Sequence, residues 1–382
     1  MLPGTQQNMS ADSTQLLEID KGITIAYADG RRASFPYIWL RDNNPAELHP
    51  DTHERLFDLG SVPLDITPVA MTLAADTLTI QWPELADFAI YSLDWLWTNR
   101  PESGRVDPAE VSVQTWNADS LSTPSQFDAA DCRAHPAILL LALETLKRMG
   151  IIIVSGLPNE LTAGEQFGDL IGFKRETNFG ATFEVVNRPE PNNLAYTALA
   201  LPLHTDLPNQ RVIPSYQFLH CYQNSSSGGA SIFADGFHVC KELQTRNPDA
   251  YRVLSTTTIP FRFHDKSVDI RMRRKIIELD ETGRVESFAF NAHIADIPDL
   301  PYTQLIEYYA AYQALLLLIR EPSMALHVNL QPGQMVVFDN TRVLHGRTAF
   351  DYQSSTRHLR GYYIEKNEVD SRMRMLSKDA AT

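Results

Sequence analysis

The stretch LPLHTDLP, residues 201–208, places a histidine and an aspartate two positions apart in an apolar, proline-flanked segment. Residues i and i+2 of a strand point to the same face of a sheet, so His204 and Asp206 are predicted to share one face. An imidazole and a carboxylate on one face can bind a metal ion and leave other coordination positions open. A lone His-x-Asp is weak evidence, because the chain has a second one at His49-Pro50-Asp51, a pattern more typical of a turn.

The segment QPGQMVVFDNTRVLHGR, residues 331–347, favours the first pair over the second. A Pro-Gly turn leads into a buried strand that ends at Asp-Asn, and a loop is predicted to deliver His345. Arg357 follows at the start of RHLRGYYIE, so we expect His345 and Arg357 on neighbouring strands of one barrel. Two histidines and a carboxylate form the facial set that suits non-haem Fe(II), and an arginine binds a carboxylate through its planar fork.

The pattern of strands and helices divides the chain into segments. Early residues alternate short strand-like runs with turns, whereas later ones combine many strand-like runs with helices at about 136–149 and 302–320. Such a pattern predicts an α+β protein, mostly β, with a sandwich or barrel and helices packed on one face. The predicted segments are a flexible N-terminus (1–15), a small β-rich N-terminal domain (16–100), a Pro/Ser/Asp-rich connector (101–130) and a large second domain (131–382).

Composition excludes several classes of partner. The net charge of −14 argues against nucleic acid or an anionic membrane as the main partner. The three cysteines have no C-x-x-C spacing, so a disulfide framework is not expected and a reducing cytoplasm is the predicted location. The N-terminus lacks the regions of a signal peptide, and the longest apolar runs are too short to cross a bilayer.

Several stretches resemble the γ-butyrobetaine dioxygenase branch of the Fe(II)/2-oxoglutarate oxygenases, which also holds trimethyllysine dioxygenase and taurine dioxygenase relatives. They are LPLHTDLP, FLHCYQNSSSGGASIFADGFHVC, KIIELDETGRVESFAFN and FDNTRVLHGR…TRHLRGYY. FPYIWLRDN and DWLWTNR resemble the small amino-terminal domain of that family, so the resemblance covers about residues 16–376. It implies a double-stranded β-helix (jelly-roll) core with packed helices, makes residues 131–382 the catalytic domain, and implies a homodimer.

The resemblance also implies a reaction and the residues that support it. An enzyme of this kind uses Fe(II), O2 and the cosubstrate 2-oxoglutarate, with ascorbate as reductant, to hydroxylate an unactivated C–H bond while 2-oxoglutarate becomes succinate and CO2. The protein holds the geometry and excludes water. By position in the family, His204, Asp206 and His345 bind the iron, Arg357 holds the C5 carboxylate of 2-oxoglutarate, Ser231 supplies a hydroxyl beside it, and Asn193 and Leu219 line the same pocket.

The family position of an aromatic cage implies a small trimethylammonium zwitterion, such as γ-butyrobetaine, as substrate, because aromatic faces attract such cations. The cage positions hold Phe179, Phe183, Tyr196, Leu207 and Tyr363, with leucine where tyrosine is usual. Phe179 and Phe183 are equally compatible with ordinary barrel core.

Asn291 matches an asparagine that contacts the acidic end of the substrate. Its neighbours Ala292 and His293 differ from those of relatives. A carboxylate and a phosphonate therefore both remain open as the acidic group, with His293 as a further contact.

Two further questions are whether the N-terminal domain binds zinc and whether the chain belongs to another functional class. Relatives bind a zinc ion through cysteines that follow the RDN motif, but here the stretch reads RDNNPAELHPDTHERLFD, and Asp87 stands at the later histidine position. No structural zinc is predicted, and His49, Asp51 and His53 are the alternative for a makeshift site. From other classes, a metal-dependent hydrolase and a catalytically silent binding protein remain open, although the complete set of iron and cosubstrate residues argues against both.

Overall fold

The computed structural model describes residues 13–186, 197–224, 228–350 and 357–381. The chain forms two compact units that divide between Val106 and Asp107, and each unit has its own hydrophobic core. Among the described residues, no helix combines the length and the apolar character that crossing a bilayer requires.

The N-terminal unit consists of two three-stranded antiparallel sheets with short helices. Alternating side chains of its strands are buried, as in Thr77–Gln81, where Leu78 and Ile80 point into the core. The hairpin formed by Gly22–Ala26 and Arg32–Pro36 turns at Gly30, whose φ of 86° suits glycine. The elements are β1 (Gln15–Ile19), β2 (Gly22–Ala26), β3 (Arg32–Pro36), α1 (Tyr37–Asp42), η1 (Pro45–Glu47), η2 (Leu59–Ser61), β4 (Ala70–Leu73), β5 (Thr77–Gln81), β6 (Ala89–Ser92) and α2 (Leu93–Asn99).

A seven-stranded sheet is the largest element of the second unit. Its order is β10-β21-β12-β19-β8-β7, with β9 paired to β21, and every pairing is antiparallel except that of β7 with β8. The strands are β7 (Gln126–Asp128), β8 (Ile151–Ser155), β9 (Lys174–Arg175), β10 (Phe183–Val185), β12 (Tyr216–Asn224), β19 (Gln334–Asp339) and β21 (Arg357–Ile364).

A four-stranded antiparallel sheet packs against one face of the seven-stranded sheet. Its order is β11 (Leu201–His204), β20 (Val343–Arg347), β13 (Ser231–Asp235) and β18 (Ala325–Val328). Apolar side chains from both sheets form one core, in which the rings of Phe233 and Phe338 meet edge to face at 5.4 Å. A sandwich of two mostly antiparallel sheets with helices outside confirms the predicted α+β class.

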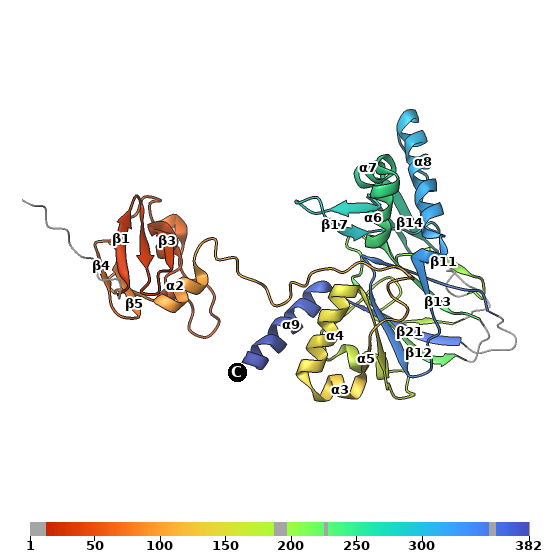
Figure 1. Ribbon diagram of the computed structural model, residues 1–382, viewed down its shortest axis with the longest axis horizontal. Helices are drawn as coiled ribbons and strands as arrows, with labels where there is room; N and C mark the ends of the chain where they lie inside the picture. The colour runs from red at the N-terminus through yellow and green to blue at the C-terminus, as the bar shows by residue number, and fades with distance from the viewer. Residues whose placement is uncertain (1–12, 187–196, 225–227, 351–356, 382) are drawn as a thin grey trace, which may run out of the picture. The chain divides into compact units, whose positions relative to one another are not determined.

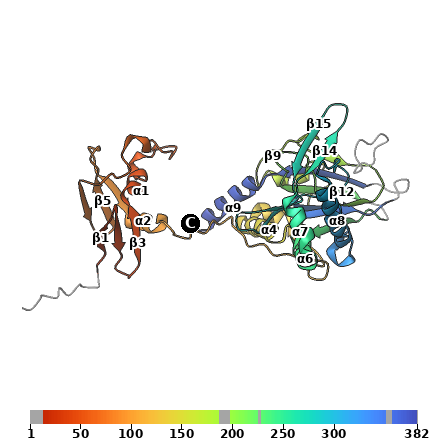
Figure 2. The ribbon, with the colours of Figure 1, turned by 90° about the horizontal axis from the view of Figure 1, so that it is seen from above.

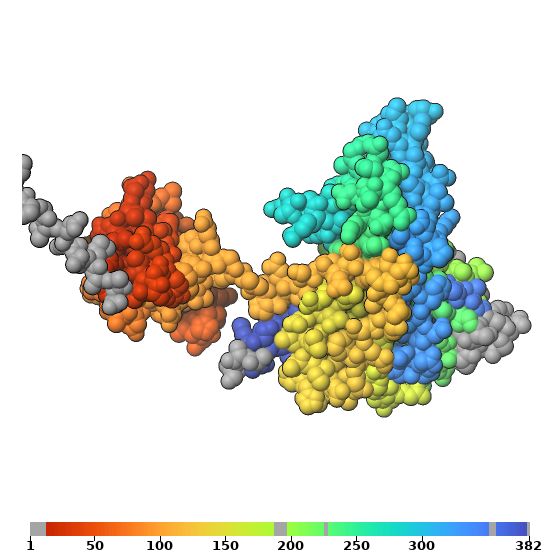
Figure 3. Space-filling view, in the orientation of Figure 1, coloured from red at the N-terminus to blue at the C-terminus, as the bar shows by residue number. Residues whose placement is uncertain are grey.

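Helices and hairpins cover the sandwich from outside. Helices α3 (Ala129–Ala134), α4 (Pro136–Met149), α5 (Ala163–Gly168) and α9 (Lys366–Ala381) pack on the outer face of the seven-stranded sheet (Figure 1). A second group consists of α6 (Gly236–Arg246), α7 (Pro248–Thr256), α8 (Tyr302–Ile319), η4 (Pro322–Met324) and the hairpins β14 (Ile259–His264)–β15 (Asp269–Arg274) and β16 (Ile277–Leu279)–β17 (Val285–Phe288). Figure 3 shows that α8 projects from the body of this unit.

The predicted connector over 101–130 is divided between the two units, and its later part is packed into a hydrophobic core. Residues beyond Val106 belong to the second unit, and both Ala109 and Trp116 are buried in its core clusters. The indole of Trp116 donates a hydrogen bond of 2.6 Å to the carbonyl of Met149. The later part of the segment therefore packs as part of the sandwich, while the predicted domain limits stay predictions.

Candidate active site

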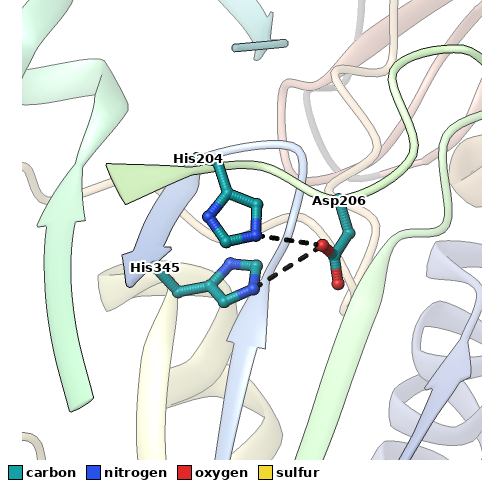
Figure 4. Close-up of side chains that lie close together, drawn as sticks. All are labelled: His204, Asp206 and His345. Carbon is teal, nitrogen blue, oxygen red and sulfur yellow. Dashed lines mark ion pairs between the residues drawn. The ribbon is translucent and has the colours of Figure 1, made fainter. Parts of the chain in front are cut away.

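The structure brings His204, Asp206 and His345 together. Their ligand atoms all lie within 4.8 Å of one another, and this is the one such group of three found among the described residues. Nε2 of His204 and Nε2 of His345 lie 3.3 and 3.7 Å from the same oxygen, Oδ1 of Asp206 (Figure 4). Three ligand atoms converging from one side fit a divalent metal ion with open positions on the other side.

Pairing of β11 with β20 sets the two histidines side by side. His204 and His345 are direct partners across this antiparallel pair, and their ring centroids are 4.3 Å apart. Nδ1 of His204 donates to the carbonyl of Pro202 at 2.9 Å, which leaves Nε2 without a proton in the neutral ring. Nδ1 of His345 is buried and has no hydrogen-bond partner in the described part of the chain.

Asp206 does not share a strand face with His204, contrary to the prediction. Strand β11 ends at His204, and Asp206 lies in a bend beyond it. The buried side chain of Asn340 holds this bend, because its Oδ1 accepts from the Asp206 amide at 2.6 Å and its Nδ2 donates to the Asp206 carbonyl at 3.0 Å. Leu207 follows with a φ of 57°, a left-handed conformation rare for leucine. Tertiary hydrogen bonds, rather than strand periodicity, therefore aim the carboxylate at the histidines.

The electrostatics of the group suit a metal ion. Burial acts to raise the pKa of the Asp206 carboxyl, but the imidazoles of His345 and His204 and the Tyr363 hydroxyl outweigh it and hold the pKa well below its usual range. Burial, aided by His204, lowers the pKa of His345 to about 3. A charged carboxylate beside a neutral imidazole is the protonation state in which such groups bind a cation.

A cavity of about 360 Å³ opens beside these three residues. The predicted cosubstrate residues Arg357, Ser231 and Leu219 all line it, from β21, β13 and β12. Burial lowers the pKa of Arg357 to about 10, which still leaves the guanidinium charged at neutral pH. The residues of both sheets therefore face one common space.

His345 and Arg357 do not lie on neighbouring strands, so this prediction is wrong. His345 belongs to β20 in the four-stranded sheet, whereas Arg357 begins β21 in the seven-stranded sheet. His345 also lies within β20 rather than in a loop. The two residues approach the cavity from opposite sheets, because the chain changes sheets between the two strands.

Comparison with known proteins identifies the family. The model for the taurine catabolism dioxygenase TauD, TfdA family matches residues 115–363, and that for the gamma-butyrobetaine hydroxylase-like N-terminal domain matches residues 14–97. The chain belongs to the TauD, TfdA dioxygenase family. Gamma-butyrobetaine dioxygenase of Pseudomonas sp. (strain AK-1) is 34% identical to this dioxygenase over 94% of each chain.

Two further relatives and one solved structure are less similar to this chain. Gamma-butyrobetaine dioxygenase of Homo sapiens is 30% identical over 92% of this chain and 93% of its own. Mitochondrial trimethyllysine dioxygenase of Homo sapiens is 28% identical over 91% and 83%. Among solved structures, the non-heme iron oxygenase OrfP with Fe and alpha-ketoglutaric acid is 14% identical, covers 64% of this chain and 94% of its own, and gives a TM-score of 0.46. The predicted resemblance to the γ-butyrobetaine and trimethyllysine dioxygenases is confirmed.

Aromatic side chains of the dioxygenase line the cavity in two pairs. The rings of Phe183 and Tyr363 are 5.3 Å apart, and those of Phe179 and Phe263 meet edge to face at 5.4 Å. Leu207 also lines the cavity. Sequence reasoning identified all of these except Phe263, which it interpreted only as part of the strand-like run TTTIPFRFHD. The predicted site residues Asn193 and Tyr196 lie outside the described residues.

Asn291 lines the cavity but is engaged within the protein. Its Nδ2 donates to the carbonyl of Thr205 at 3.2 Å, and its Oδ1 accepts from the His293 amide at 3.0 Å. The ring of His293 lies 6.1 Å from that of His204. Asn291 therefore ties its own segment to Thr205, the residue before Asp206.

Arg347 is a cavity residue that sequence reasoning missed. It lies two residues after His345 in β20, and its Nη2 donates to the carbonyls of Thr197 and Leu199 at 2.6 and 2.9 Å. Burial lowers its pKa to about 10, with a smaller contribution from Arg357. The sequence signal was its place in LHGR, since an arginine two positions after a metal-ligand candidate points to the same side of a strand.

The second His-x-Asp of the dioxygenase is a turn. Nδ1 of His49 accepts from the amides of Asp51 and Thr52 at 3.3 and 3.2 Å. His49, Asp51 and His53 do not form a group of converging ligand atoms.

Proposed function

We propose that the dioxygenase hydroxylates an unactivated C–H bond of a small trimethylammonium zwitterion, using Fe(II), 2-oxoglutarate and O2. The observation that carries the proposal is the convergence of His204, Asp206 and His345 beside a cavity that also holds Arg357 and two aromatic pairs. Relatives named gamma-butyrobetaine dioxygenase and trimethyllysine dioxygenase support this substrate class.

In this proposal each polar residue has one task. Nε2 of both histidines and a carboxylate oxygen of Asp206 hold the Fe(II). Bound Fe(II) would supply, together with O2 and 2-oxoglutarate, the oxidising power for hydroxylation: one oxygen atom would go to the substrate and the other to the succinate that forms as CO2 leaves. Arg357 holds the C5 carboxylate of 2-oxoglutarate through its planar guanidinium. Ser231 and Leu219 complete the cosubstrate pocket. The family position adds Asn193, which lies outside the described residues.

The aromatic residues form the subsite for the cation. Ring faces attract weakly hydrated quaternary ammonium groups, and removal of water strengthens this attraction. Phe179, Phe183 and Tyr363 serve as cage residues, with Leu207 as an apolar neighbour. The family position adds Tyr196, which lies outside the described residues. A trimethylamino-alkylphosphonate or another small acid is the alternative substrate for the same cage.

The surroundings of the metal group speak against a hydrolase. Asp206 is the one carboxylate among the described residues that line the cavity, and it already faces both histidines. A metal-dependent hydrolase commonly uses a further carboxylate as general base. A homodimer and ascorbate as reductant complete the proposal and rest on the family resemblance, whereas the cytoplasmic location rests on the cysteine pattern. Light scattering tests the homodimer.

Succinate formation tests the proposed function. The purified protein is assayed with Fe(II), ascorbate, air and 2-oxoglutarate, and with γ-butyrobetaine, trimethyllysine, trimethylaminoethylphosphonate or taurine as substrate. We expect one of the trimethylammonium compounds to stimulate succinate formation, and His345→Ala to abolish it. Stimulation by taurine alone would contradict the proposed cation subsite, and failure to form succinate with any compound would contradict the proposed substrate class.

A further inference from the structure

Strand β14 forms a wall of the cavity that the family resemblance did not assign. Arg262 and Phe263 both line the cavity, and the amide of Arg262 donates to the carbonyl of Ile294 at 2.8 Å. Ile294 follows closely after Asn291, whose side chain bonds to Thr205 between the metal-ligand candidates. Hydrogen bonds therefore connect β14 to the metal-binding bend. Figure 2 shows the β14–β15 hairpin projecting beyond the sheets of this unit.

The acidic end of a zwitterion needs a hydrogen-bond donor or a cation. Asn291 alone is a poor candidate, because its side chain is already hydrogen-bonded within the protein. One amide hydrogen of Asn291 is used on Thr205, and its oxygen already accepts from His293. Ala292, the next residue, has no polar side chain. Arg262 is a cation of this wall: its amide bonds to the carbonyl of Ile294, and its side chain is two-thirds buried.

Arg262 has unused hydrogen-bonding capacity. Its Nε and Nη2 donate to the two oxygens of Asp269 at 2.9 and 3.1 Å. No hydrogen bond among the described residues uses its Nη1. Asp269 also accepts from Nε of Arg271 at 3.0 Å and from Nη2 of Arg271. Arg262 and Arg271 therefore share the carboxylate of Asp269, and Asp296 also acts on the charge of Arg271. The Nη1 edge of Arg262 is the part of this group that remains for an anion.

We propose that Arg262 recognises the acidic head group of the substrate, a carboxylate or a phosphonate, through the edge of its guanidinium that Asp269 leaves free. This inference rests on the proposed function, because it assigns the second end of the same zwitterion. The aromatic pairs hold the ammonium group, and Arg262 determines that the other end is anionic. Asp269 fixes the plane of the guanidinium by binding it in a fork.

Steady-state kinetics of Arg262→Gln test the assignment. We expect KM for the trimethylammonium acid to rise roughly 10- to 100-fold with little change in kcat, because one charge-assisted contact is lost. The inhibition constant of a trimethylammonium alcohol of the same length is expected to stay within about twofold, since it has no anion to lose. Arg262→Lys should restore part of the affinity, because it keeps the charge without the fork.

Arg271→Gln is the matched control. Arg271 shares Asp269 with Arg262 but does not line the cavity, so its loss is expected to leave KM for the acid within about twofold. An equal rise in the constants for acid and alcohol in Arg262→Gln would show that Arg262 merely supports the hairpin, and would overturn the inference. So would an unchanged KM for the acid.

The two proposals fail in different ways. If the wild-type enzyme turns over a trimethylammonium acid and Arg262→Gln does so equally well, the inference alone is overturned. If no trimethylammonium compound stimulates the wild-type enzyme, the proposed function fails and the inference falls with it. The wild-type ratio of kcat/KM for γ-butyrobetaine and trimethylaminoethylphosphonate then distinguishes the two acidic groups.

Discussion

The hydroxyl of Tyr363 donates a hydrogen bond of 2.7 Å to Oδ2 of Asp206, while both histidines of the candidate site face Oδ1. The two oxygens of one carboxylate therefore have different partners. The ring of Tyr363 also packs at a tilt against that of Phe183, so that a single side chain connects the metal-ligand candidates to the aromatic wall.

Tyr363→Phe is expected to weaken Fe(II) binding roughly 10- to 100-fold, the usual effect of removing a hydrogen bond that orients a metal ligand. The ring is kept, so its packing on Phe183 is retained. Anaerobic titration with Fe(II), or with Mn(II) as an inert substitute, measures the dissociation constant. Tyr222→Phe, which removes a hydroxyl outside the cavity, serves as control. Equal affinities in wild type and Tyr363→Phe would contradict the orienting role.

Gly361→Ala is expected to disturb the aromatic wall. A Cβ at this position would lie 2.6 Å from the Phe183 ring and 2.8 Å from Cδ2 of Leu219, so at least one of these side chains must move. Overpacking of this kind typically costs about 1–3 kcal/mol of stability. We expect KM to rise for substrate and for 2-oxoglutarate together. Gly60→Ala is the control, because its Cβ meets only the flexible side chain of Asp58, and it should alter neither KM. A wild-type KM for both ligands in Gly361→Ala would show that the aromatic wall tolerates the added methyl group.

His220 is expected to make stability depend on pH. Both of its ring nitrogens are buried without a hydrogen-bond partner in the described chain, and burial lowers its pKa. The unfolded chain therefore binds a proton more readily than the folded one, so the free energy of unfolding falls as the pH drops below about 6.5. His220→Leu should flatten this dependence and add about 1 kcal/mol at pH 8, because an unsatisfied polar group is removed.

Urea denaturation between pH 5 and pH 8 measures this effect. Replacement of the exposed His327 by leucine is the control and should keep the wild-type slope. If His220→Leu loses as much stability on acidification as the wild type, another group is responsible.

Asp235→Asn is expected to destabilise the second unit by about 3–5 kcal/mol, because it leaves the charge of Arg342 buried and uncompensated. Arg342 and Asp235 are 1% and 0% exposed, and the Nη2–Oδ2 distance is 2.9 Å. Asp107→Asn breaks an exposed ion pair with Arg374 and should change the urea midpoint little. Similar midpoints for the two variants would mean that water reaches the buried pair.

The sequence predicted those features that depend on local pattern. The apolar periodicity of Pro136–Met149 and Tyr302–Ile319 is contained within each segment, and both helices occur at nearly the predicted limits. The pairing of His204 with Asp206 was also predicted, but for the wrong reason. The bend at Asp206 depends on Asn340, which is distant in the sequence, and no strand rule anticipates such a contact.

The rest of the site depends on which strands meet. Arg262 and Phe263 reach the cavity because β14 pairs with β15 and with the segment at Ile294. The sequence TTTIPFRFHD contains no pattern that predicts these pairings. Likewise, Arg357 and His345 approach the cavity from two facing sheets. Because only 11 residues separate them in the sequence, the prediction had placed them on adjacent strands of one sheet. Long-range pairing and packing, not residue type, determine these placements.

The candidate metal site forms only when β11 and β20 are correctly paired. His204 and His345 face each other only in this register. A slip by one residue would turn one of the two imidazoles to the opposite face of the sheet. These strands come from distant parts of the chain, so their pairing requires closure of a long loop. A metal ion that binds all three ligands would selectively stabilise correctly paired chains. Iron supply during synthesis would then influence how much protein reaches the native fold, in addition to how active that protein is.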